Sequence, residues 1–203
     1  MDFIMRAWKK SEGTSSGWSL SCRLLVAFLL MLPQQGMSET KGIAIRYVTG
    51  AMIGNTYMVN ANIDYHFSAE AEKALIHGVP LQFDTRIKVK NHRRWIWDKT
   101  ISAVLITYKL QYHPLSGYYL VTNMHSGERQ QFRNLDDATG YLGKLKNYPL
   151  MTRNALGADT GVYYGLINVK LDIQSLPVPL RPLAYLSTQW RLSSPTYVWN
   201  IHP

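Results

Sequence analysis

One short segment combines residue types that bind proteins and membrane surfaces. Residues 91–98 read Asn-His-Arg-Arg-Trp-Ile-Trp-Asp, so Arg93 and Arg94 stand directly before Trp95 and Trp97. In an extended chain the two tryptophans project from one face, because they are two residues apart. Tryptophan and arginine dominate the energetic centres of interfaces, and they attract each other through cation–π contacts. We therefore take these four residues as a candidate binding site. The alternative is that both indoles pack in a core while the arginines face solvent.

The other polar residues give little indication of catalysis. Asp64 and His66 would share one face of a strand, and such a pair can act as a general base. A solvated strand face explains them better. The adjacent acids Asp136 and Asp137 stand where a helix is expected to begin, and the helix dipole accounts for them. The sequence contains neither a glycine-rich phosphate loop nor a nucleophile elbow. We therefore favour a protein without enzymatic activity.

Metal, cofactor and nucleic-acid binding are not expected either. The six histidines are never three or four residues apart, which is the spacing of a local zinc motif. The single cysteine, Cys22, lies in the N-terminal segment, so disulfides and thiolate metal sites are not expected. The chain is basic, with a net charge of +9. No RNA- or DNA-binding signature is complete, however, so nucleic acid is not an expected partner.

Residues 1–38 have the pattern of a targeting segment. An apolar run at residues 24–32 follows several basic residues and ends before Pro33. As a helix this run rises only about 14 Å, well short of the ~30 Å hydrocarbon core of a membrane. Gly36 and Ser38 are small residues at the −3 and −1 positions of a cut after Ser38. We predict a cleaved signal peptide, or alternatively an uncleaved N-terminal membrane anchor in which the longer segment 18–32 spans with Arg23 snorkelling, and hence an exported protein.

Most of residues 39–203 alternate between apolar and polar side chains, which is typical of strands with one buried face. The alternation is clearest at residues 57–67. Further strands are expected at residues 81–90, 101–112, 118–124, 128–132 and 162–173, with a final pair around 190–192 and 197–201.

Two short helices are expected between these strands. Ser68 has the residue type of an N-cap for the first, which stops before Gly78. Asn134 caps the second, which has acids in its first turn and Lys144 and Lys146 at its end.

The fold prediction follows from these elements. Residues 177–182 are rich in proline, and we expect them to form a rigid crossing between two sheets. Residues 39–203 are predicted to be one domain, a two-sheet antiparallel β-sandwich, immunoglobulin-like or similar, with two short helical insertions. A signal or anchor helix precedes it.

Five short motifs in this order resemble a known family. They are GVPL at 78–81, RWIWD at 94–98, LQYHPLS at 110–116, LDIQSLPVPL at 171–180 and WRLSS at 190–194. The chain is similar over residues 43–201 to domain of unknown function 4390, an uncharacterised family of Gram-negative bacteria often labelled proline-rich signal peptide proteins. The resemblance implies an exported or membrane-anchored domain, for which we predict a periplasmic location, and supplies no catalytic residues. The family's genes often lie near a membrane sensor kinase of the nitrogen-regulation type, which implies a signalling partner in the envelope.

Together these features predict an envelope protein that binds a membrane protein partner through Arg93, Arg94, Trp95 and Trp97. Two alternatives stay open. The positive charge suits binding to anionic lipid or an envelope polymer. A hydrolase would need an acid and a histidine, such as Asp64 and His66, to meet at a pocket in the folded chain.

Overall fold

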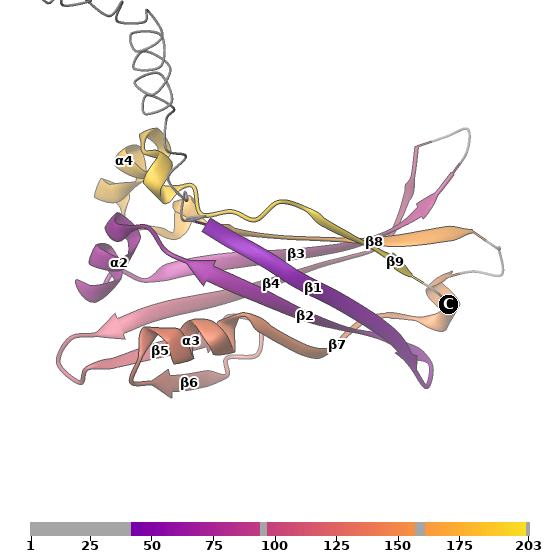
Figure 1. The fold of residues 1–203 in the computed structure, drawn as a ribbon, viewed down its shortest axis with the longest axis horizontal. Coiled ribbons are helices and arrows are strands. Elements are labelled where there is room, and N and C mark those ends of the chain that lie inside the picture. Colours follow the sequence, from indigo (N-terminus) through magenta and orange to yellow (C-terminus); the bar gives the residue numbers. More distant parts are fainter. Residues whose placement is uncertain (1–41, 94–96, 157–160, 202–203) are drawn as a thin grey trace, which may run out of the picture. The chain divides into compact units, whose positions relative to one another are not determined.

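The computed structural model describes residues 42–93, 97–156 and 161–201 (Figure 1). They belong to one compact unit, Thr40–Pro203. Within them the strands form two antiparallel sheets, so the fold is mainly β. The smaller sheet has the order β1 (Gly42–Ile53), β2 (Thr56–His66) and β7 (Lys144–Thr152). The larger has the order β6 (Arg129–Phe132), β5 (Tyr118–Asn123), β4 (Lys99–His113), β3 (Leu81–His92), β8 (Val162–Leu171) and β9 (Tyr197–Ile201).

The buried faces of both sheets contribute to one hydrophobic core. In β2 every apolar residue of the predicted inward face is buried: Tyr57, Val59, Ala61, Ile63 and Tyr65. The rings of Tyr65 and Phe67 meet Phe83 of β3 with centroids 5.2 and 5.5 Å apart, so the smaller sheet packs on the larger there. The alternation predicted for β2, β3 and β8 is confirmed, because every second residue of each strand faces the core.

The strand order differs from that of an immunoglobulin domain. There the sheets have the orders A-B-E-D and C-F-G. Here β3 to β6 form a continuous run of neighbours, and β8 and β9 extend the sheet on the other side of β3.

The two predicted helices are present, with one change of boundary. α2 (Ala69–Ile76) begins at Ser68, whose Oγ accepts the backbone N–H of Ala71 at 3.2 Å. α3 (Leu135–Leu142) is shorter than expected, because Lys144 already belongs to β7. Gly143 separates the two elements, and a Cβ there would clash with the carbonyl oxygen of Ile63. The close passage of the chain against β2 therefore ends the helix.

The prediction of only two helices was wrong, since a third, α4 (Arg181–Leu186), lies in the proline-rich region. A 3₁₀ turn, Val178–Leu180, leads into it. Pro182 stands in the first turn of α4, where its missing N–H needs no partner. The prediction of a rigid crossing between two sheets was also wrong, because this helical segment connects β8 and β9 of the same sheet. Trp190 likewise ends a 3₁₀ turn, Thr188–Trp190, where a strand was expected.

The strand register defines two ends of the domain. Gly42 pairs with His66, and Phe83 pairs with Leu171, so β1 begins at the same end as α2 and α4 (Figure 1). We call this the proximal end. His92 pairs with Val162 at the other, distal end, where β3 leads into β4. At about 3.3 Å per residue, the stretch of β3 from Phe83 to His92 separates the two ends by about 30 Å. Among the described helices, none has the length and apolar character needed to cross a membrane.

Candidate functional site

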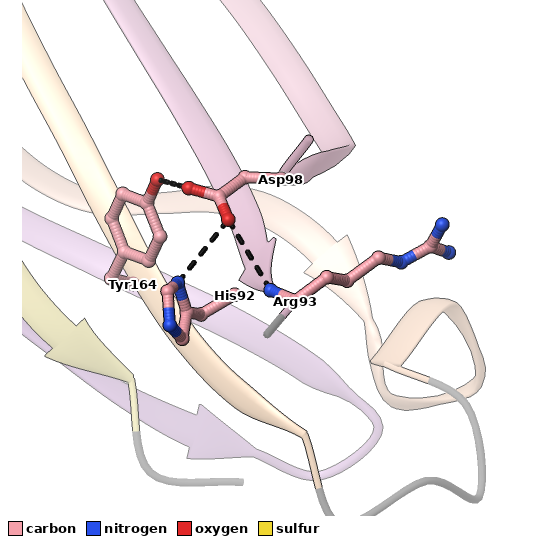
Figure 2. Close-up of polar contacts among 4 residues, drawn as sticks. All are labelled: His92, Arg93, Asp98 and Tyr164. Atoms are coloured by element: carbon pink, nitrogen blue, oxygen red, sulfur yellow. Dashed lines mark hydrogen bonds and ion pairs between the residues drawn. The ribbon is translucent and has the colours of Figure 1, made fainter. Parts of the chain in front are cut away.

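Asp98 lies at the base of the distal loop between β3 and β4 and contacts three groups (Figure 2). Its Oδ1 accepts the backbone N–H of Arg93 at 3.2 Å and lies 3.2 Å from Nδ1 of His92. Its Oδ2 accepts the hydroxyl of Tyr164 at 2.5 Å. These partners come from the end of β3 and from β8. The carboxylate therefore ties both ends of the loop to a neighbouring strand.

The same contacts hold Asp98 in its ionised form. The Tyr164 hydroxyl, followed by the backbone N–H of Arg93, lowers the pKa of the Asp98 carboxyl below its ordinary value. The bond to Asp98 in turn raises the pKa of the Tyr164 phenol. A carboxylate with a lowered pKa is a weak base, and a phenol with a raised pKa is a poor nucleophile. The chemistry of this cluster therefore suits positioning of the loop more than acid–base catalysis.

Arg93 and Trp97 flank the loop, and both are exposed. The side chain of Trp97 is 93% accessible, so it has no place in the core. The side chain of Arg93 extends away from Asp98 (Figure 2). Their backbones are held close to each other by the bond from Arg93 to Asp98, the residue after Trp97. The other two candidate residues, Arg94 and Trp95, lie outside the described residues.

Tyr164 was missed by the sequence analysis. Its partner Asp98 lies far away in the chain, and only the folded sheet brings them together. The alternation of residues along β8 could have identified it. Tyr163 is buried on the inner face of β8, so the alternation puts Tyr164 on the outer face. An aromatic hydroxyl on the outer face of a strand is a candidate for a cross-strand hydrogen bond.

Asp64 and His66 lie in a different place, along an open groove of about 470 Å³ beside β2 and α3. Asp64 forms an ion pair with Arg46 of β1, which shares the groove with it. Within the described ranges, no three His, Cys, Asp or Glu residues come together as a metal site.

Comparison with known proteins gives one match. Residues 40–200 match the family described as Domain of unknown function (DUF4390). Neither the curated proteins nor the solved structures contain a match to the chain.

Proposed function

We propose a function for this chain, which belongs to the DUF4390 family, from the geometry of its distal loop. The protein is a non-enzymatic envelope module that binds a membrane protein partner. The contact is made by the distal tip, which we define as Arg93 and Trp97 together with the other two candidate residues of the sequence, Arg94 and Trp95. The observation that carries the proposal is Trp97, which is 93% exposed beside a loop base fixed by Asp98.

The energetics of such a contact are favourable. A tryptophan buries 150–250 Å² when it is fully covered. At about 25 cal/mol per Å², that burial contributes about 4–6 kcal/mol before the costs of association. The hydrogen bonds of Asp98 to Arg93 and Tyr164 lower one of those costs, because the loop ends are ordered before the partner arrives. Arg93 adds a planar cation that pairs with carboxylates.

The proposal includes a location and a fold class. Residues 1–38 act as a signal peptide or a membrane anchor and direct the domain to the periplasm. The targeting pattern and the basic residues before the apolar run support this. The two antiparallel sheets form a β-sandwich, which the contacts of Tyr65 and Phe67 with Phe83 support.

Co-purification of the full chain tests the function. The protein carries a C-terminal tag, is expressed at its native level and is extracted in gentle detergent. We expect a stoichiometric membrane protein with the wild type and its loss with Trp97→Ala or Arg93→Ala. Ile53→Ala is the matched control, because Ile53 is an exposed apolar residue at the distal end of the smaller sheet. Equal recovery of the partner with all variants, or no partner with the wild type, would contradict the proposal.

A further inference from the structure

Exposed apolar side chains gather at the proximal end, far from the distal tip. They extend from the end of α2, from the turn between β4 and β5 and from the segment around α4. We define them as the proximal surface: Ile76, Leu115, Val178, Leu183, Tyr185 and Leu186. Leu115 is fully exposed, and Leu186 is 84% exposed. The end of α2 lies near the β4–β5 turn, since a Cβ on Gly78 would be 3.9 Å from Cδ of Pro114.

The segment around α4 has the composition of a membrane interface. A helix on a protein surface normally turns polar residues outward. α4 buries Ala184 and instead exposes Leu183, Tyr185 and Leu186. Asp172 is the last acidic residue of the sequence, and Arg181 and Arg191 are the only Lys or Arg residues after it. Apolar and aromatic side chains with nearby arginines are typical of segments that lie at the boundary between headgroups and acyl chains.

The start of β1 lies at the proximal end, and this limits how far the proximal surface can be from the N-terminal apolar run. β1 begins at Gly42, where a Cβ would lie 3.8 Å from the carbonyl oxygen of Ser193, just after the Thr188–Trp190 turn that contacts α4. Residues 33–41 connect Gly42 to the apolar run at 24–32. Even fully extended, these residues span at most about 30 Å. A membrane that holds the apolar run is therefore within reach of the proximal end.

We propose that the proximal surface docks on the anionic lipid bilayer that holds residues 24–32. This inference rests on the anchor form of the proposed function. The leucines, Val178 and Tyr185 enter the headgroup–acyl boundary, and the exposed Arg191 faces the anionic headgroups. α2 also carries the acids Glu70 and Glu72, so the contact is mainly apolar and depends only weakly on salt. In this orientation the distal tip stands about 30 Å further from the membrane.

Lipid quenching of site-specific labels tests the orientation. The full chain with Cys22→Ser receives one cysteine, labelled with an environment-sensitive fluorophore, and is reconstituted into phosphatidylcholine–phosphatidylglycerol vesicles. Leu186→Cys and Leu115→Cys report the proximal surface. Ile53→Cys and Val162→Cys are the matched controls, because these apolar residues are also exposed but lie at the distal end. Flotation of the vesicles after a urea wash reports anchoring separately. All six positions of the proximal surface are exposed, so the substitutions leave the core intact.

We expect the protein to float with the vesicles and a headgroup nitroxide to quench the proximal labels several-fold more than the distal ones. Leu183→Glu should weaken that quenching at position 115. A protein that floats with equal quenching at both ends would overturn the docking while leaving the anchor in place. A protein that does not float would overturn the anchor, and the docking with it. Proximal labels shielded from water but not reached by the nitroxide would mean that protein, such as a second copy, covers the surface.

Discussion

The hydroxyl of Tyr164 in β8 donates a hydrogen bond to Asp98 at 2.5 Å, although β3 lies between β8 and β4, the strand that Asp98 directly precedes. The bond passes the distal end of β3, where His92 also approaches the same carboxylate. The loop with Trp97 is thus fastened to three consecutive strands of one sheet. These contacts fix the backbone next to Trp97, so its exposed side chain extends from an ordered base.

Removing only the Tyr164 hydroxyl should loosen the distal loop. In Tyr164→Phe we expect faster hydrogen exchange at the amides next to Asp98 and a higher pKa of the Asp98 carboxyl, since its main stabilising donor is lost. The thermal unfolding midpoint should change little, because the bond lies at the surface of the sheet. Hydrogen exchange with mass spectrometry provides the measurement. Unchanged hydrogen exchange around Asp98 would show that the hydrogen bond from Tyr164 to Asp98 does not order the loop.

Acid should release the loop only well below neutral pH. The folded pKa of Asp98 is lowered from 3.8, so its contribution is complete above that value and is lost as the pH falls through the folded pKa. We expect constant order of the loop from pH 7 down to about pH 4 and loss below it. Carboxyl NMR of Asp98 with hydrogen exchange at each pH follows the change. Asp98→Asn is the control, because it should remove this acid transition; a transition that persists there belongs to another group.

Phe83 should be a main contributor to the stability of the core. It is fully buried between Tyr65 and Phe67. We expect Phe83→Ala to lower the free energy of unfolding by about 3–5 kcal/mol, because it leaves a cavity between the sheets. Urea unfolding provides the measurement. Leu105→Ala in the adjacent strand is the control, since Leu105 is exposed and its loss should stay within about 0.5 kcal/mol. A small effect of Phe83→Ala would mean that the sheets do not meet at this residue.

Gly165 should tolerate no side chain. It pairs with Trp199 across β8 and β9, and a Cβ would clash with the indole ring. We expect Gly165→Ala to lower the stability by about 1–3 kcal/mol through overpacking. Gly140→Ala is the control, because it meets nothing within 4 Å in α3 and should stabilise the helix by about 0.5–1 kcal/mol. Equal effects of the two substitutions in thermal unfolding would contradict this packing.

Strands could be predicted where the alternation is unbroken. β2, β3 and β8 place every second residue in the core, so their pattern is readable in the sequence. β1 was not predicted, because a register shift between Ile45 and Tyr47 interrupts its alternation. β7 was not predicted because it contains Pro149 and two register shifts. Its place at the edge of the smaller sheet is where a strand tolerates proline.

The candidate site could be predicted only in part, for a similar reason. Arg93 and Trp97 are only four residues apart in the sequence, so their residue types alone indicated a candidate binding site. The pairing of Asp98 with Tyr164 depends on the order β4-β3-β8, which no local pattern contains. The distinction between a core tryptophan and an exposed one also needs the fold. Trp97 is exposed in the structure, so the alternative of an indole packed in the core is wrong for that residue.

Photocrosslinking at position 97 tests the central claim most directly. A photoreactive amino acid with a large aromatic side chain replaces Trp97 in the full chain in cells, so that the aromatic contact removed by Trp97→Ala is kept. The same residue at Ile53 serves as the control at the same end of the domain. We predict one adduct with a membrane protein from position 97 and none from position 53. No adduct from position 97, or the same adducts from both positions, would contradict the claim that the distal tip binds a partner.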